Sequence, residues 1–222
     1  MAVWDNPSKE APRIAICIPY TAEVTMQWAY QSLGPLLYVP LGWCEKTPKM
    51  CRGLPLNVAR DELVRLALED SKVTHLLWVD TDNIAESPND INEALKALYQ
   101  CNVPIVSGLY RAKQREGFSY AAWIDAKLSD RIGFVAIDQW SGNFIKVDTI
   151  GFGFCLIKRE VFEKMPKPWF PWSVPSPSED FNFCINARKM GYDINVLTDV
   201  KIGHIGQLYI SSADGKISTL AI

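Results

Sequence analysis

Two aspartates separated by one threonine follow a short apolar run in HLLWVDTDN, residues 75–83. The run predicts a buried strand, so Asp80, Thr81 and Asp82 would lie just beyond its carboxyl end, where open α/β sheets bind ligands. Carboxylate oxygens are hard ligands that suit Mg²⁺ or Mn²⁺, and these ions bridge to phosphate. Aspartate and asparagine also form turns readily, so this motif alone leaves a turn and a metal site both open.

One arginine and a pair of acids could take part in related chemistry. Arg60 borders the apolar stripe of a predicted helix, so its charge needs a partner, either an internal carboxylate or a nucleotide with its phosphates. Glu179 and Asp180 occupy the first turn of another predicted helix, where the helix dipole stabilises carboxylates. A proline-rich aromatic loop precedes them, and such loops often shape substrate sites, so capping and function both stay open.

The chain has two histidines. His75 begins a predicted strand, and we expect it to be structural. His204 lies in IGHIG, after the last predicted strand, where nearby glycines let the backbone approach another group closely. A neutral imidazole is a good ligand for Mn²⁺ or Zn²⁺, so His204 is a candidate metal ligand and equally a candidate structural residue.

Predicted strands and helices alternate along the first half of the chain. The expected strands are 13–19, 74–79 and 103–111, and the expected helices are 21–37, 56–70 and 87–101, with Thr21 and Ser87 as N-caps. Residues 38–55 are rich in proline and glycine and are expected to form a loop. This alternation predicts an α/β fold with a mostly parallel central sheet and helices on both faces.

The second half is less regular. Residues 111–150 are irregular and contain two possible short strands, and the expected fold also includes a small antiparallel element. The remaining expected elements are short strands at 133–138 and 144–150, a strand at 154–157 followed by a short helix, a loop at 166–178, a helix at 178–191 with Ser178 as N-cap, and a final strand and loop at 193–206.

Composition limits the functional classes. The 222 residues are 48% hydrophobic with a net charge of −2, which fits one domain with a large core and gives no basic surface for nucleic acid. No apolar run approaches the roughly 18–20 residues needed for a transmembrane segment, and the N-terminus has no signal-peptide core. We therefore expect a soluble cytoplasmic protein, with peripheral membrane contact left open. Its six cysteines should be free thiols, although Cys44 and Cys51 could pair.

These features occur in one order: a strand, Asp-x-Asp, a Glu-Asp helix start, and Gly-His near the end. The chain resembles the GT-A-fold glycosyltransferases, especially the family-2-like group that uses nucleotide-sugar donors. The matching segments are IAICIPY, NVARDELVRLAL, HLLWVDTDN, VSGLYR, GFGFCLIKREVFEKM, PWF and SEDFNFCINARKMGYDINVLTDVKIGHIG. The resemblance implies a single GT-A, Rossmann-like domain at 13–210, divided near residue 110 into nucleotide-binding and acceptor halves, between tails at 1–12 and 211–222.

The resemblance also implies roles for particular residues. The donor's base would lie near Ile18, and its phosphates would complete the shell of a bound Mn²⁺ or Mg²⁺. The implied metal ligands are Asp80, Asp82 and His204, with Asp80 also facing the ribose and a metal-bound water. The implied donor-binding residues are Pro19, Tyr20, Arg60, Asp80, Thr81, Tyr110, Arg111, Phe152 and Gly153.

In inverting members of this group the aspartate of the Glu-Asp pair is the usual general base, which implies Asp180, with Glu179 as the alternative. A retaining, front-face path is the alternative if no carboxylate lies near the acceptor. The expected donor is a UDP-hexose, and the acceptor could be a carbohydrate, a lipid-linked molecule or a protein. Trp169, Phe170 and Trp172 could form an aromatic platform for the acceptor or pack onto the core.

Two other functions stay open. A sugar nucleotidyltransferase shares the architecture, the paired acids and Mg²⁺, but usually has a glycine-rich, arginine-containing loop after the first strand. Here that stretch is IPYTAEVTM, which contains no glycine. A non-catalytic nucleotide- or sugar-binding relative is the second alternative, and only an activity measurement separates it from an enzyme.

Overall fold

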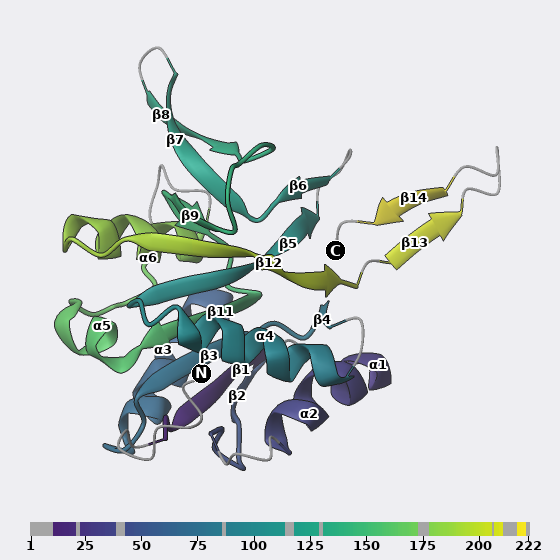
Figure 1. Ribbon diagram of the computed structural model, residues 1–222, viewed down its shortest axis with the longest axis vertical. Coiled ribbons are helices and arrows are strands. Elements are labelled where there is room, and N and C mark those ends of the chain that lie inside the picture. Colours follow the sequence, from purple (N-terminus) through teal and green to yellow (C-terminus); the bar gives the residue numbers. More distant parts are fainter. Residues whose placement is uncertain are drawn as a thin grey trace.

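A large central sheet organises the computed structural model (Figure 1). The structure describes residues 11–20, 23–38, 43–85, 88–113, 118–128, 131–172, 178–205, 207–210 and 217–220. Along its main path the sheet has the order β2-β1-β3-β11-β5-β12-β4, with β6 beside β5 and β9 beside β12. These strands are β1 (Ile14–Tyr20), β2 (Lys49–Arg52), β3 (His75–Val79), β4 (Asn83–Ile84), β5 (Ile105–Lys113), β6 (Phe118–Tyr120), β9 (Phe144–Val147), β11 (Phe154–Lys158) and β12 (Ile194–His204).

Most neighbouring long strands of this sheet run the same way. β2, β1 and β3 pair in parallel, and so do β5 and β12. β11 lies antiparallel between β3 and β5, so the carboxyl ends of β1, β3, β5 and β12 all face one edge. The expected α/β architecture with a mostly parallel sheet is therefore confirmed.

Helices cover both faces of the sheet, and each face has its own apolar core. One core includes side chains from α3 (Leu56–Leu68), α5 (Arg159–Lys164) and α6 (Glu179–Lys189). The other includes side chains from α1 (Met26–Trp28), α2 (Gly34–Leu37) and α4 (Pro88–Gln100). Strands buried on both faces explain why the predicted β1, β3 and β11 are nearly continuous apolar runs.

The first helical segment differs from its predicted form. It begins at Met26, because the side chain of Thr25 caps it by accepting a hydrogen bond from the Trp28 N–H. A π-helical stretch, η2 (Ala29–Leu33), joins α1 to α2, and Gly34 N–H bonds to the Ala29 carbonyl. Pro35 provides a reason, because its ring would clash with the carbonyl four residues earlier in a regular α-helix. The N-caps expected at Thr21 and Ser87 lie outside the described residues.

Several strands were not expected. β2 lies inside the stretch 38–55, which we expected to be a loop, and β7 (Ala122–Leu128) lies in the irregular region. β7 pairs antiparallel with β8 (Arg131–Ala136) and β10 (Thr149–Ile150) in a small sheet, which confirms the small antiparallel element. Near the end of the chain, β13 (Gln207–Ile210) and β14 (Ile217–Leu220) form a hairpin in a region that includes part of the expected tail.

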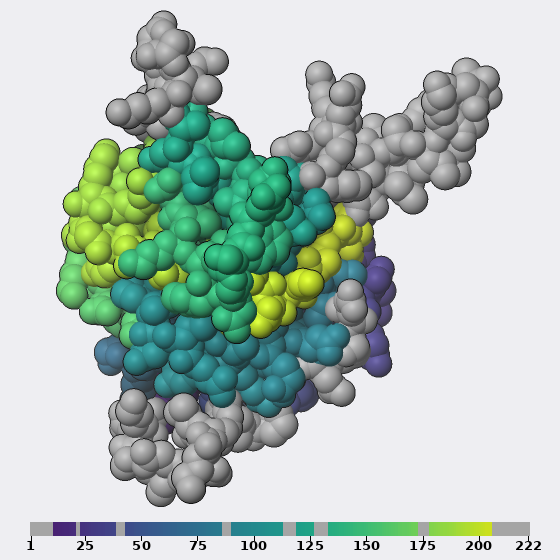
Figure 2. Space-filling view, turned by 45° about the horizontal axis from the view of Figure 1, so that its top comes forward, coloured from purple at the N-terminus to yellow at the C-terminus, as the bar shows by residue number. Residues whose placement is uncertain are grey.

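The small sheet is fastened to α6. Arg188, in the last turn of α6, forms ion pairs with Asp125 at 2.9 Å and with Asp148 at 2.7 Å. At the other end of the helix, the Phe181 ring packs 4.7 Å from the rings of both Trp123 and Phe134. Figure 2 shows residues of the small sheet, in teal and green, on the face beside α6, in yellow-green. The first turn of α6 is thus held from outside as well as from the core.

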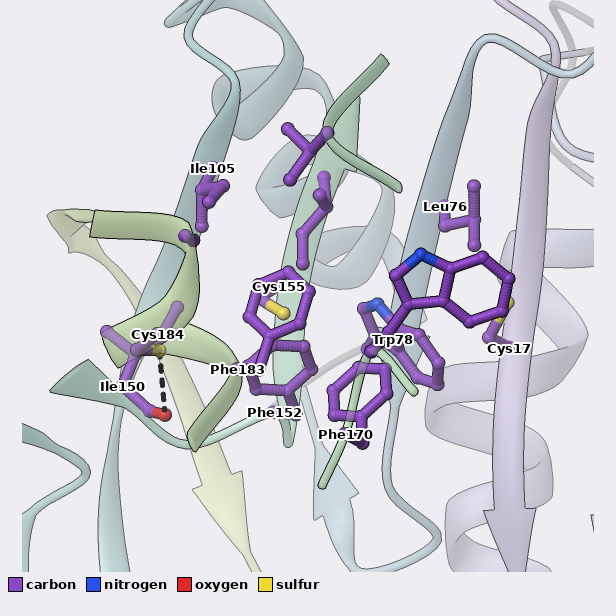
Figure 3. Close-up of a cluster of buried hydrophobic side chains, with 14 of the residues drawn as sticks. Cys17, Leu76, Trp78, Ile105, Ile150, Phe152, Cys155, Phe170, Phe183 and Cys184 are labelled. Carbon is purple, nitrogen blue, oxygen red and sulfur yellow. Dashed lines mark hydrogen bonds between the residues drawn. The ribbon is translucent and has the colours of Figure 1, made fainter. Parts of the chain in front are cut away.

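Aromatic side chains fill the core between α3, α6 and the sheet (Figure 3). The Phe170 ring stacks on Phe183 with centroids 4.9 Å apart, and it meets the edge of Trp78 at 5.3 Å. Trp169 is also buried, and its indole N–H donates to the Phe162 carbonyl. Two of the three aromatics considered for an acceptor platform are therefore core residues.

Trp172 is different, because it is 60% exposed. The six cysteines are free, as expected, since none forms a disulfide. No helix within the described ranges is both long and apolar enough to cross a membrane.

We predict that Phe170→Ala lowers the free energy of unfolding by about 3–5 kcal/mol, because it leaves a cavity in a close-packed aromatic cluster. Trp172→Ala, in the same loop, should change it by less than about 0.5 kcal/mol. Urea denaturation of both variants measures this. Equal losses would contradict the division of this loop into core and surface residues.

Candidate active site

The Asp80–Asp82 segment forms a tight turn at the carboxyl end of β3. Asp80 N–H donates to the Gly153 carbonyl at 3.0 Å, and Asn83 N–H donates to the Asp80 carbonyl at 3.1 Å. The indole N–H of Trp28 donates to the same Asp80 carbonyl at 2.9 Å. The backbone is thus fixed from three directions. Asp80 and Asp82 are partly exposed, so the turn holds their carboxylates at the sheet edge.

Arg60 is the buried cation of the site. Its side chain is only 2% exposed, and the guanidinium carbon lies 5.3 Å from the ring centres of both Trp78 and Phe152, which pack edge to face beside it. Arg60 Nε donates to Glu179 Oε1 at 3.0 Å, and Nη2 donates to Asp80 Oδ1 at 3.2 Å. Of the two partners considered from the sequence, internal carboxylates are the ones in contact with Arg60.

Asp82 and His204 meet side chain to side chain. His204 Nε2 lies 3.0 Å from Asp82 Oδ2, and Nδ1 lies 2.7 Å from the Arg111 carbonyl. A carbonyl only accepts, so Nδ1 must carry a hydrogen. A neutral ring would then turn the Nε2 lone pair toward a carboxylate oxygen, which is unfavourable. A protonated ring, a protonated carboxyl or a cation between the two atoms removes this repulsion.

The donor set of this pair fits a divalent cation. Two ligands about 2.1 Å from one ion, at a right angle, lie about 3.0 Å apart. The Arg111 carbonyl behind Nδ1 is the kind of partner that orients a metal-binding imidazole. No group of three or more potential ligand side chains gathers anywhere in the described chain. Any ion on Asp82 and His204 would therefore need further oxygen ligands from water or from a bound molecule.

Tyr110 and Gly153 pack against each other and against His204 and Asn83. The Tyr110 hydroxyl accepts a hydrogen bond from Gly153 N–H at 2.9 Å, and the ring meets the edge of His204 at 5.9 Å. A Cβ on Gly153 would lie 2.4 Å from Asn83 Oδ1, so only glycine permits this close approach. Burial raises the pKa of Tyr110 well above its ordinary value, so its hydroxyl stays neutral.

Asp180 is half-buried in the first turn of α6. Its Oδ1 accepts hydrogen bonds from the Phe181 N–H and from the Ser178 hydroxyl. Burial, aided by repulsion from Glu179, raises the pKa of Asp180 to about 6. Glu179 itself is 2% exposed and faces Arg60. Of the two acids, Asp180 is the one with solvent access. Its raised pKa suits proton transfer near neutrality.

The structure places the other predicted residues as follows. Pro19 is buried and Tyr20 half-buried at the carboxyl end of β1, the strand beside β3. Thr81 lies half-buried in the turn, and Phe152 is buried beneath Arg60. Arg111 is exposed; its guanidinium stacks 4.1 Å above the Tyr120 ring and donates to the Tyr120 hydroxyl.

Trp28 and Asn83 were not predicted as site residues. Trp28 holds the Asp80 carbonyl, and Asn83 is buried between the turn and Gly153, with Ser32 Oγ donating to its carbonyl at 3.0 Å. Asn83 directly follows the Asp-x-Asp motif, so its position was a signal in the sequence. Nothing in the sequence marked Trp28, because its contact to Asp80 spans 52 residues.

Comparisons with known proteins define the fold and leave the family open. No protein-family model matches the chain, and no curated protein matches it. Among solved structures, the crystal structure of A197 from STIV is similar over 95% of each chain, with 18% sequence identity and a TM-score of 0.59. At this identity the likeness shows a shared fold alone.

Two further solved structures are more distant. GalNAc-T7 with UDP, GalNAc and Mn²⁺ has 12% identity and a TM-score of 0.49, over 88% of this chain and 44% of GalNAc-T7. CMP:2-keto-3-deoxy-manno-octonic acid synthetase complexed with CTP has 10% identity and a TM-score of 0.47, over 88% of this chain and 92% of the synthetase. Likeness this weak does not assign a function.

We predict that Asp180→Asn stabilises the folded protein at pH 8 by about 1 kcal/mol and leaves it unchanged below about pH 4. The pKa of Asp180 is about 6 in the folded protein, against 3.8 ordinarily, so the folded state holds the proton more tightly. The stability contributed by the protonated acid is present below about pH 4 and is lost as pH rises through about 6.

The expected gain is smaller than the two pKa values alone would give, because Asp180 is partly exposed. Urea denaturation of the wild type and the variant at both pH values measures it. A variant less stable than the wild type at pH 8 would contradict the raised pKa of this carboxyl.

Proposed function

We propose that the protein is a metal-dependent glycosyltransferase that moves a sugar from a nucleoside-diphosphate sugar, with UDP-hexose as the expected donor, to an acceptor hydroxyl. The observation that carries this proposal is the Asp82–His204 pair, with its 3.0 Å separation and its fixed imidazole. The order of motifs in the sequence and the α/β fold support it, because sheets of this kind bind ligands at the carboxyl ends of their strands.

In this proposal Asp82 and His204 would hold Mn²⁺ or Mg²⁺, with further oxygen ligands supplied by the donor's phosphates. Such an ion acts as a Lewis acid that stabilises negative charge on a departing diphosphate. Asp80, at the start of the same turn, would face the ribose. Pro19 and Tyr20, at the carboxyl end of β1, lie on the same sheet edge and would contact the nucleotide base.

Other residues shape the sugar side of the site. Arg111 is exposed beside His204 and carries a positive charge, so it suits the donor phosphates or the sugar. Phe152 and Tyr110 would support the sugar side of the site from within the core, since both side chains are buried. Gly153 keeps the backbone close to Asn83 and leaves no side chain over the turn.

Asp180 is the proposed general base. It takes the proton from the acceptor hydroxyl as the hydroxyl oxygen attacks C1 of the sugar and the bond to the diphosphate breaks. Direct displacement inverts the configuration at C1, through an oxocarbenium-like transition state. Because its pKa is about 6, Asp180 is mostly ionised at pH 7 and still basic enough to accept a proton.

We expect the wild type to bind one nucleoside diphosphate among UDP, GDP, CDP and dTDP in the presence of Mn²⁺, and to lose that binding in EDTA. Asp82→Ala and His204→Ala should each weaken it at least about tenfold, because each removes one metal ligand. Asp199→Ala is the matched control, since Asp199 is exposed on the same strand as His204. Isothermal titration measures all four proteins, and unchanged binding by both site variants would refute the metal assignment.

Asp180→Asn should reduce sugar transfer by about 10²–10⁴-fold, as expected for a lost general base, while the affinity for the Mn²⁺–nucleotide stays within about threefold. Steady-state kinetics with the donor found by titration tests this, with binding measured on the same samples. Full turnover by this variant would remove Asp180 as the base.

A further inference from the structure

The position of Arg60 does not suit direct contact with a nucleotide. Its side chain is only 2% exposed, and two adjacent aromatic rings pack against the guanidinium. Both of its described donor contacts go to carboxylates of the protein, one at the end of β3 and one at the start of α6. A guanidinium buried in this way can influence the site only through the carboxylates that it contacts.

The two partners sit next to the groups proposed to do the chemistry. Asp80 begins the turn that carries Asp82, and Glu179 directly precedes Asp180 in the first turn of α6. Arg60 therefore joins a segment of the proposed metal site to the segment of the proposed base. The contacts span 20 residues on one side and 119 on the other, so no local structure fixes this relation.

Guanidinium geometry suits this role better than an ammonium. The planar fork directs Nε at Glu179 and Nη2 at Asp80 at the same time, whereas a lysine has one nitrogen to share between them. The adjacent rings of Trp78 and Phe152 pack against the guanidinium and limit its movement. The distance between the two carboxylates is thus set by a rigid group.

We propose that Arg60 is a positioning residue that fixes the first turn of α6, and with it Asp180, relative to the Asp80–Asp82 turn. This inference rests on the proposed function, because it concerns how the base is aligned with the bound donor. Misplacing a reacting group by about 1 Å can cost about 100-fold in rate, so loss of this link should appear mainly in turnover.

The test uses Arg60→Lys, Glu179→Gln and the double variant, with Arg65→Lys as the matched control. Arg65 lies on the same helix and also forms ion pairs, with Glu62 and Glu69, but at the exposed surface. Lysine at position 60 keeps the buried charge, so the variant avoids leaving two carboxylates without a cation. Measured for each protein are kcat, the affinity for nucleotide with Mn²⁺, and the melting temperature.

Glu179→Gln should lower kcat by about 10–100-fold and change the Mn²⁺–nucleotide affinity by less than about threefold. Arg60→Lys should lower kcat by at least as much and also weaken binding, because Asp80 loses its partner. The double variant should have a kcat within about threefold of Arg60→Lys, because both changes break the same link. Arg65→Lys should match the wild type in kcat and affinity.

Two results would overturn the positioning role and leave Arg60 structural. One is a loss of kcat in the double variant equal to the product of the two single losses. The other is a lowered melting temperature with a normal kcat in the variants. Those results need an active wild type. Absence of metal-dependent nucleotide binding in the wild type itself would overturn the proposed function and this inference together, so the two failures are distinguishable.

Discussion

The ion pairs of Arg60 are the interaction on which the rest of the site depends. A guanidinium 2% exposed is stable only while carboxylates face it, and removing one partner of such a pair typically costs about 3–5 kcal/mol. Here the carboxylates come from two distant segments, so the chain meets this requirement only when α3, the end of β3 and the start of α6 are all in place. Asp82 and Asp180 lie close in sequence to the paired Asp80 and Glu179, so the same requirement places four acids at one edge of the sheet.

The sheet topology explains why those segments can meet. β3, β5 and β12 end at the same edge, and β11 runs back between β3 and β5, which brings Gly153 under the Asp80 turn. β12 ends beside β4, in register with Asn83, so His204 arrives next to Asp82. The small sheet then holds α6 from the other side through Phe181 and Arg188. Each proposed site residue is therefore positioned by a strand or helix that packs into the core.

The sequence predicts the parts of this arrangement that depend on local patterns. Continuous apolar runs identified β1, β3 and β11, and helical periodicity identified α3. The end signals Ser178 and Gly191 identified α6, and Gly191 is in the left-handed region just after it. β2 and β7 were not predicted. KMCR is short and AWIDAKL mixes polar and apolar residues, so both form strands mainly through long-range pairing. The first helix begins at Met26, later than expected, with Thr25 as its N-cap.

The candidate site residues also divide into those that local patterns predict and those that depend on the fold. Residue type and spacing were enough to select Asp80, Asp82, Asp180 and His204 as candidates. The identity of Arg60's partners was not predictable, because an internal carboxylate and a nucleotide explain a buried arginine equally well until the fold brings Glu179 across from α6. The burial of Trp169 and Phe170 likewise depended on which side of their loop faced the core, which composition does not encode.

The most direct test of the account is pulsed electron paramagnetic resonance of Mn²⁺ bound to the protein together with the nucleoside diphosphate. The account predicts phosphorus couplings from the diphosphate and a nitrogen coupling from the His204 imidazole in the same spectrum, with the nitrogen coupling absent in His204→Ala. A Mn²⁺ spectrum with phosphorus couplings but no nitrogen coupling in the wild type would contradict the assignment of Asp82 and His204 as the metal-binding pair.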